Sequence, residues 1–316
     1  MSTAAPRTVT IGVLTFRRPA DLAALLPMLA EQAARAAATG HRAEVLVVDN
    51  DPAGSGRAVV AAAGCPVVRY VLEPEPGIAA ARNRVLAEAH DRDVLVFIDD
   101  DERPRDDWLA QLLGTHRRTG AAAVAGAVVS DFSGPVDPWL VEGGFFVRRR
   151  LPTGTPIDVA ATNNLLLDLR QLRPTGLRFD VAFGASGGED TLFTRGIAQR
   201  GLTMVWCDEA VVTDVVPVDR ATRSWVLRRA FSSGNSVSRV HLALAGSAAA
   251  RLRVRLSCTG GGLPRLTAGL GRWALGAVTG SVRHRARGLR TAARGAGMVA
   301  GAAGHVYQEY GRPRPV

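Results

Sequence analysis

Lysine is absent from this chain of 316 residues, so all 39 basic side chains are arginines. A single arginine in such a chain is weaker evidence for bidentate ligand recognition than usual. Cysteine is scarce, and Cys65, Cys207 and Cys258 are too few and too scattered to form a disulfide framework or a zinc site. We therefore expect the chain to work in a reducing compartment.

Long apolar segments are also missing. The first residues show no apolar stretch after a basic start, which argues against a signal peptide. No apolar run approaches the roughly 18–20 residues that a bilayer-spanning helix needs. We expect a cytoplasmic protein that makes any membrane contact peripherally, from the cytosolic face.

Acidic residues nearly disappear from the last quarter of the chain. Residues 241–316 hold 12 of the 39 basic side chains and a single acid, Glu309, which gives this segment a net charge of +11. Residues 1–240 hold the other 27 basic and 28 acidic side chains and are close to neutral. A surface that binds polyanions would therefore lie near the C-terminus.

Apolar strands alternate with amphipathic helices over the first 130 residues. This order is typical of α/β proteins with a mostly parallel sheet that helices cover on both faces. Glycine and proline become frequent after about residue 130, and alanine, glycine and arginine dominate after about residue 245. We expect one half of a domain at 1–130, its second half at 131–245 and a basic, helical tail at 246–316. The first four strands are expected at 8–14, 44–48, 67–72 and 94–98.

Aspartates directly follow two of these strands. Asp49 ends the second strand, and the run Asp99–Asp101 ends the fourth. Ligands of open α/β sheets bind beyond the carboxyl ends of the strands, and adjacent carboxylates suit a hard divalent cation that also binds substrate phosphates. The alternative is a solvated acidic turn. A dinucleotide site is disfavoured because no G-x-G-x-x-G sequence follows the first strand.

Five short motifs occur along the chain in the order TFRRP, VDND, PGIAAARN, FIDDDERP and GGED. With these motifs the chain resembles the inverting glycosyltransferases of family 2, over roughly residues 8–240. The resemblance implies a GT-A fold, which is Rossmann-like, and transfer of a sugar from a nucleotide-diphosphate sugar to an acceptor hydroxyl. It also implies a divalent metal, manganese or magnesium, and a UDP-sugar as the most common donor.

The resemblance assigns residues to the nucleotide position by position. Thr15 and Arg17 would line the nucleotide pocket, and Asp49 would hydrogen-bond the base. Arg82, near the start of its helix, would meet the diphosphate. Two alternatives stay open, because Asp49 is also suited to capping a turn and Arg82 could be an ordinary surface charge.

The run of three aspartates completes the implied donor and metal site. Asp99 would hold the ribose, Asp100 belongs to the same donor-binding group, and Asp101 would bind the metal. Many relatives have a histidine ligand after a late strand, where this sequence has Asp214. Aspartate is an acceptable ligand for a hard cation.

Two further pairs are assigned to catalysis and to the acceptor. Transfer with inversion needs a base for the acceptor hydroxyl, and the resemblance implies Asp190 as the base, with Glu189 orienting the acceptor. Asp190 could equally cap the helix that follows. Asn163 and Asn164, inside a strand-like run, would hydrogen-bond acceptor or sugar hydroxyls, or else cap a bulge.

The function predicted from the sequence is metal-dependent sugar transfer to a glycan or lipid-linked acceptor. One alternative is a sugar nucleotidyltransferase, which also places aspartates and a metal at strand ends but needs a glycine-rich loop that this chain lacks. The other is a non-catalytic, membrane-anchored protein that binds sugar nucleotides. Intact Asp99, Asp101 and Asp190 argue against that alternative.

The tail contains apolar residues at helical spacing with arginines between and beyond them. An apolar stripe with basic flanks and a tryptophan is typical of helices that lie in a membrane interface. The alternatives are a helix that packs on its own domain and a disordered segment; no nucleic acid is expected, because the body has no basic stripe with interleaved aromatic residues. The stripe consists of Leu263, Leu266, Leu270, Trp273, Ala274, Ala277 and Val278.

Overall fold

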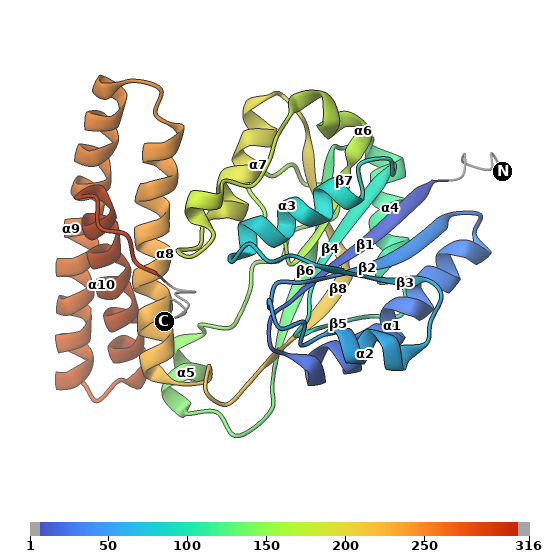
Figure 1. Cartoon of the computed structure of the whole chain (residues 1–316). Helices are drawn as coiled ribbons and strands as arrows, with labels where there is room; N and C mark the ends of the chain where they lie inside the picture. Colours follow the sequence, from blue (N-terminus) through green and yellow to red (C-terminus); the bar gives the residue numbers. More distant parts are fainter. Residues whose placement is uncertain (1–6, 309–316) are drawn as a thin grey trace. The chain divides into compact units, whose positions relative to one another are not determined.

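The computed structural model describes residues 7–308, which divide into two compact units (Figure 1). The first unit comprises Met1–Val129, Arg148–Val181 and Glu189–Val215, and the second comprises Ser130–Val147, Ala182–Gly188 and Val216–Val316. This division differs from the three consecutive segments expected from the sequence. The long helix at Arg223–Leu244, which precedes the tail, belongs to the same unit as the tail helices. The segments Ser130–Val147 and Ala182–Gly188, from the middle of the chain, belong to this unit too.

Half of the sheet in the first unit is parallel, as the alternating pattern predicts. Eight strands lie in the order β3-β2-β1-β4-β7-β6-β8-β5, and the first four of these pair in parallel. Their apolar residues fill both faces of the sheet, because the sheet is covered on both sides. These strands are β1 (Thr8–Thr15), β2 (Arg42–Asp49), β3 (Val68–Leu72) and β4 (Val94–Asp99).

The other half of the sheet corrects the expectation of a mostly parallel sheet. The strand after β4 in the sheet, β7, runs antiparallel to β4 and to β6, and β5 pairs antiparallel with β8. The late part of the sheet includes one long continuous strand, β8. These strands are β5 (Glu102–Pro104), β6 (Ala123–Phe132), β7 (Asn164–Asp168) and β8 (Met204–Val216).

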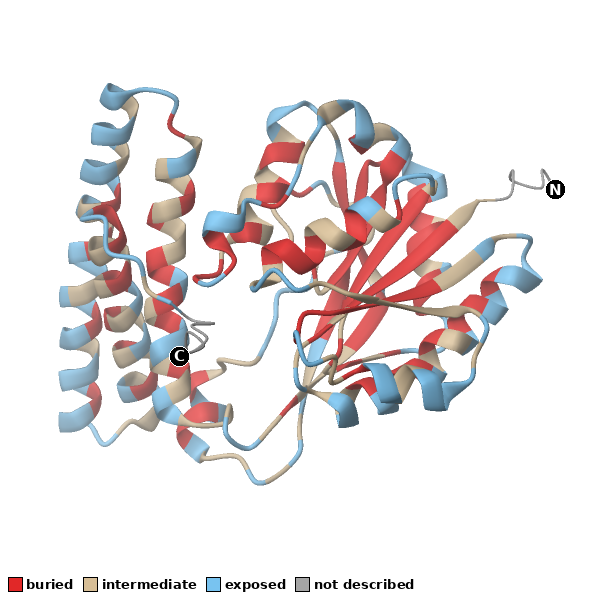
Figure 2. Cartoon of the chain, viewed as in Figure 1, coloured by how far each residue is buried: buried red, intermediate tan, exposed pale blue. Residues whose placement is uncertain are grey.

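Alternate residues of each strand enter separate cores on the two faces of the sheet, which is the period-2 rule of a strand. Val45 and Val47 of β2 join the core under α1, α2 and α4, whereas Leu46 and Val48 join the core under α3, α6 and α7. Figure 2 shows the central strands as almost wholly buried. The covering helices are α1 (Pro19–Ala38), α2 (Arg57–Ala63), α3 (Ile78–Glu88), α4 (Trp108–Thr119), α6 (Leu169–Leu172) and α7 (Glu189–Gln199), with 3-10 turns at Arg173–Thr175 and Val181–Phe183.

The second unit is helical, and α8, α9 and α10 lie side by side in it (Figure 1). Glycines 262, 269 and 276 of α9 face α10, and a Cβ on Gly269 would lie 2.5 Å from the backbone nitrogen of Ala292. Such close backbone approach is possible only for glycine. No helix in residues 7–308 is both long enough and apolar enough to cross a membrane. The helices are α5 (Pro138–Gly143), α8 (Arg223–Leu244), α9 (Ala248–Val278) and α10 (Val282–Ala302).

Candidate active site

The carboxyl ends of β1, β2 and β4 bring three of the predicted residues to one edge of the sheet. In the parallel register Thr15 lies opposite Asp49, and Leu14 lies opposite Asp99. The chain leaves β4 through Asp100 and Asp101 and enters β5 at once. The parallel register therefore brings the ends of these three strands together.

Asp100 anchors the turn that follows β4. Its carboxylate accepts hydrogen bonds from the Thr15 hydroxyl at 2.9 Å and from Arg18 Nη1 at 3.0 Å, and the residue is 4% exposed. Burial raises the pKa of Asp100 to about 6, although the charge of Arg18 opposes that rise. Thr15 and Asp100 are thus engaged with the protein itself, and neither presents a free polar atom to a ligand in this arrangement.

Four carboxylates gather around the end of β4. Glu102 of β5 lies directly opposite Asp214 of β8, and the negative charges of Asp99, Asp101 and Asp214 all act on Glu102. Burial raises the pKa of Asp99 to about 6, with Arg82 lowering it and Asp101 raising it. The pKa of Glu102 is raised well above its usual value, by burial first and then by these three neighbours.

These four carboxylates suit a metal ion that is bound partly by the protein and partly by a substrate. In residues 7–308 no three Asp, Glu, His or Cys side chains are arranged to hold an ion by themselves. Magnesium and related ions are usually bound by one or two carboxylates together with substrate phosphates. Asp101 and Asp214 are each partly accessible, with side-chain exposures of 15% and 14%, and Asp214 also pairs with Arg148.

Asp49 ties together the loop that follows β2. Its carboxylate accepts from the backbone N–H of Asp51 at 2.9 Å, from the backbone N–H of Gly56 at 2.7 Å and from the Tyr70 hydroxyl at 3.0 Å. Asp49 has no exposed surface. The turn-capping alternative therefore describes this structure, and a contact with a base stays a prediction that requires this loop to open.

Arg17 and Arg18 are adjacent in the sequence and differ completely in their surroundings. Arg17 is the non-glycine residue with a positive φ, 56°, in the described part of the chain, and its side chain is 67% exposed and lies 3.5 Å from Asp51. A non-glycine residue in this region of φ is often functional. Arg18, which the sequence analysis did not assign, bridges Asp100 and Asp101.

Arg82 is a buried residue, because its side chain is only 4% exposed. Its guanidinium pairs with the Glu189 carboxylate, which is equally buried, and stands over the Phe179 ring. The surface-charge alternative for Arg82 is therefore wrong. The contact with a diphosphate stays a prediction, and in this structure Arg82 joins α3 to the first turn of α7.

Glu189 and Asp190 begin α7. Burial raises the pKa of Glu189, although Arg82 opposes this, and Glu189 Oε2 is buried without a hydrogen-bond partner. Asp190 is half-buried, and its Oδ1 accepts from the backbone N–H of Thr191 at 2.6 Å. Because α7 already begins at Glu189, Asp190 lies inside its first turn and is not the N-cap. An acidic residue in the first turn is favourable, and the catalytic role stays a prediction.

The neighbouring asparagines have opposite environments. Asn163 is half-buried and donates to Glu102 at 2.5 Å, which places it beside the carboxylate group. Asn164 begins β7 and is buried, and its amide bonds Trp108 Nε1 and the carbonyls of Ala127 and Ala210. The structure therefore gives Asn164 a role inside the sheet and corrects its assignment to the acceptor.

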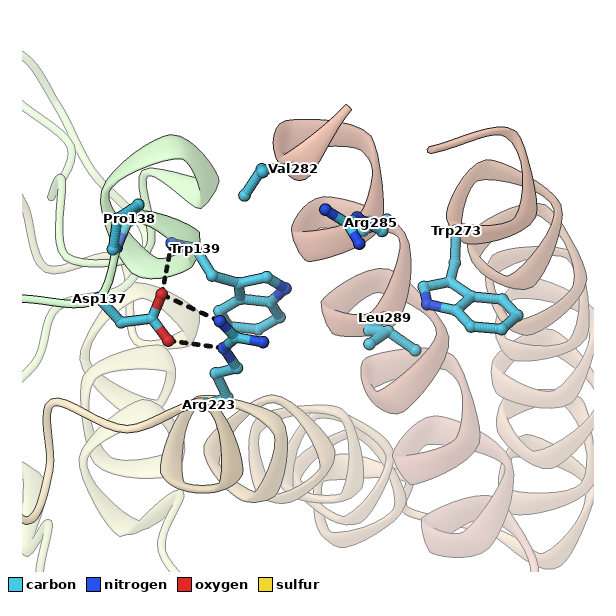
Figure 3. Close-up of a pocket in the computed structure, with 8 residues that line it drawn as sticks. All are labelled: Asp137, Pro138, Trp139, Arg223, Trp273, Val282, Arg285 and Leu289. Atoms are coloured by element: carbon cyan, nitrogen blue, oxygen red, sulfur yellow. Dashed lines mark hydrogen bonds and ion pairs between the residues drawn. The ribbon is translucent and has the colours of Figure 1, made fainter. Parts of the chain in front are cut away.

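A cavity of about 440 Å³ lies in the helical unit (Figure 3). Asp137 forms hydrogen bonds of 2.6 and 3.1 Å with Arg223 on one wall and neutralises its charge. None of the predicted donor, metal or catalytic residues lines this cavity. Its lining consists of Asp137, Pro138, Trp139, Arg223, Trp273, Val282, Arg285 and Leu289.

Residues outside the prediction complete the site. Glu102 follows the three aspartates directly in FIDDDERP, and Arg18 is the second arginine of TFRRP. Both were visible as charged residues within the motifs that carry the prediction. Their roles depend on the short strand β5 and on the turn before α1, which the sequence pattern did not indicate.

Comparison with known proteins identifies the class of this site. Residues 10–169 match the family model described as Glycosyl transferase family 2. The chain is 39% identical over 236 residues to the succinoglycan biosynthesis protein ExoM of Rhizobium meliloti (strain 1021). The aligned residues cover 73% of this chain and 74% of that protein.

Two solved structures share the fold at low sequence identity. The S. aureus TarS fragment 1–349 in complex with UDP-GlcNAc has a TM-score of 0.52 and 14% identity, over 95% of this chain and 93% of that one. The structure of GalNAc-T7 with UDP, GalNAc and Mn²⁺ has a TM-score of 0.51 and 12% identity, over 72% of this chain and 51% of that one. These similarities confirm the expected GT-A-type α/β fold.

Proposed function

As a member of glycosyl transferase family 2 the chain is a glycosyltransferase, and we propose that it transfers a sugar with inversion from a UDP-sugar to an acceptor hydroxyl. One observation carries the proposal: Asp99 and Asp101 lie at the end of β4, and Glu102 of the strand that follows pairs in register with Asp214 of β8. Family membership also removes the two alternatives, a nucleotidyltransferase and a non-catalytic binding protein.

The donor would lie at the carboxyl ends of β1, β2 and β4. Arg17 is exposed there in an uncommon backbone conformation, which suits a contact with the nucleotide. Asp99 is half-buried and would hold the ribose. The choice of uridine is supported by UDP or UDP-GlcNAc in the solved TarS and GalNAc-T7 structures.

Asp101 and Asp214 would hold a divalent metal, manganese or magnesium. Their accessible carboxylates leave room for the phosphate oxygens that such ions also bind. The ion, when bound, neutralises charge on the departing diphosphate. Mn²⁺ in the solved GalNAc-T7 structure supports the choice of ion.

Asp190 would act as the general base. As the acceptor oxygen forms its bond to the anomeric carbon and the nucleoside diphosphate leaves with its bonding electrons, Asp190 takes the hydroxyl proton. Glu189 would position this helix turn through Arg82, and Asn163 would contribute a polar contact to the acceptor or sugar. A glycan or lipid-linked acceptor is supported by ExoM, whose name places it in succinoglycan biosynthesis.

The catalytic proposal is tested with Asp101→Asn. The variant should lose most metal-dependent hydrolysis of a UDP-sugar and keep the far-UV circular dichroism of the wild type, because Asn keeps the size and removes the charge. Binding of UDP with Mn²⁺ should raise the melting temperature of the wild type, since a ligand at 100 times its Kd adds about 2.7 kcal/mol. Full activity of Asp101→Asn, or of the wild type in EDTA, would falsify the metal assignment.

We further propose that the tail contacts a membrane surface through the outer face of α9. Leucines 252, 256, 263 and 270 recur on this face at intervals of four or seven residues and are 46–65% exposed. A different face of α9, with glycines 262, 269 and 276, packs on α10, so the self-packing alternative describes only that face. With five arginines and no acid in each of α9 and α10, the positive charge suits anionic lipids.

The membrane proposal is tested by co-sedimentation with vesicles that contain anionic phospholipid. Leu263→Gln/Leu270→Gln should weaken binding by about tenfold or more, because two apolar side chains no longer enter the interface. Leu275→Gln is the matched control, since Leu275 is 53% exposed on the same helix but lies outside the stripe. Equal binding of all three proteins contradicts the proposal, and a change of oligomeric state in the double variant would assign the stripe to a second copy of the chain.

A further inference from the structure

Arg18 occupies the position of a cation among the carboxylates. It is the residue before α1, and its Nη1 lies 3.0 Å from Asp100 Oδ1 and 2.7 Å from Asp101 Oδ2. Two carboxylates this close repel each other unless a positive charge compensates them. In this structure Arg18 supplies that charge.

The contact with Asp101 conflicts with the proposed metal site. A divalent ion on Asp101 would bring two positive charges to a carboxylate that already binds a guanidinium. Arginine cannot relieve this repulsion by losing its proton, because its guanidinium stays charged in proteins. The guanidinium must therefore move, and it has room to do so, because the Arg18 side chain is 36% exposed.

Asp100 would keep its place when Arg18 moves. Its second oxygen, Oδ2, accepts from the Thr15 hydroxyl at 2.9 Å, and both of these residues are buried. The side chain of Asp101 is more accessible than that of Asp100, at 15% against 6%. The released charge of Arg18 needs a new partner, and guanidinium groups bind phosphates in a bidentate manner.

We propose that Arg18 is a resident cation that holds Asp101 in the empty enzyme and transfers to the donor's diphosphate when metal and donor bind. The inference rests on the proposed metal site. It makes Arg18 a positioning residue that disfavours metal binding without nucleotide and favours nucleotide binding with metal. Loss of Arg18 should therefore strengthen metal binding without nucleotide and weaken nucleotide binding with metal. Loss of a residue that only stabilises the fold would not change the two affinities in opposite directions.

For Mn²⁺ binding without UDP, Arg17 provides a matched control one residue away. Arg17→Gln removes the same charge, but Arg17 pairs with Asp51 and makes no contact with Asp100 or Asp101. Arg18→Lys provides the second variant. It keeps the charge beside Asp101, and it guards against a loss of folding in Arg18→Gln, which each protein's circular dichroism and melting temperature would report.

The test measures Mn²⁺ binding without any turnover, by the electron paramagnetic resonance signal of free Mn²⁺, with and without UDP. Without UDP, Arg18→Gln should bind Mn²⁺ about tenfold more tightly than the wild type, whereas Arg17→Gln and Arg18→Lys should stay within about twofold. With saturating Mn²⁺, calorimetry should show UDP binding to Arg18→Gln weakened by about tenfold.

The outcomes separate this inference from the function on which it rests. If the wild type, Arg18→Gln and Arg17→Gln bind Mn²⁺ equally, or if Arg18→Gln binds it more weakly, Arg18 does not compete with the metal and the inference is overturned alone. If none of the proteins binds Mn²⁺ even with UDP, the metal assignment fails and the role of Arg18 fails with it.

Discussion

The buried pair of Arg82 and Glu189 gives the sharpest stability prediction. Both side chains are 4% exposed, and they join α3 to the first turn of α7. Removing one partner of a buried ion pair leaves the other charge without compensation and costs about 3–5 kcal/mol. We expect Arg82→Met and Glu189→Gln each to lower the free energy of unfolding by about that amount, somewhat less for Glu189→Gln because the amide oxygen still accepts.

The double variant separates the pair from the packing around it. Arg82→Met/Glu189→Gln removes both charges, so it should cost less than the sum of the single variants by about 2–3 kcal/mol. Urea unfolding followed by circular dichroism gives the free energy of unfolding of the wild type, the two single variants and the double variant. The dependence of that free energy on urea concentration should be the same in all four, which confirms that their transitions are alike.

An exposed pair on the same helix is the control for this cycle. Arg84 and Glu88 are four residues apart on α3, with side-chain exposures of 41% and 23%. Arg84→Met should cost at most about 0.5 kcal/mol, as exposed helical pairs do. If the Arg82 and Glu189 variants are additive within about 0.5 kcal/mol, the two residues do not interact and the reasoning from burial is refuted.

Three further predictions test single features of the chain. Asp190→Asn should lower turnover by about 10²-fold or more while calorimetry shows UDP binding unchanged, because the amide cannot take the acceptor proton; normal turnover would remove Asp190 from the base role. Asn164→Ala should lower the free energy of unfolding by about 3 kcal/mol in urea, since it leaves buried donors and acceptors without partners, and a loss below about 1 kcal/mol would argue against that network. Gly269→Leu should lower the melting temperature of the helical unit, because the new side chain would meet the α10 backbone; an unchanged melting curve would contradict the close packing of α9 and α10.

The strand ends were predictable because apolar runs and aspartates are both local signals. Asp49 and Asp99 follow uninterrupted apolar strands, and the parallel register brings their strands to one edge. The direction of β7 was not predictable in this way. An apolar strand carries no mark of its direction, and only the pairing of Leu165–Leu167 with β4 and β6 shows that it runs antiparallel.

Adjacent residues with the same side chain show where sequence reasoning fails at the site. Asn163 and Asn164 were predicted to act together, yet successive side chains near a strand point to opposite sides. One therefore reaches Glu102 and the other Trp108. A Cβ on Gly126 would lie 2.3 Å from the Asn164 amide, so the glycine opposite Asn164 was the signal that its side chain is packed inside the sheet.

The tail illustrates how small residues override hydrophobicity in deciding which face of a helix is buried. The leucine stripe of α9 was the evident apolar face, but it is the face with glycines 262, 269 and 276 that packs on α10. Glycines spaced seven residues apart let the backbones of two helices approach closely at successive turns. The many van der Waals contacts made there are individually weak but together stabilise the helix pair. The leucines are left exposed as a consequence. An exposed apolar stripe on a helix that carries arginines and no acidic residue suits the anionic bilayer proposed above, which is apolar inside and negatively charged at its surface.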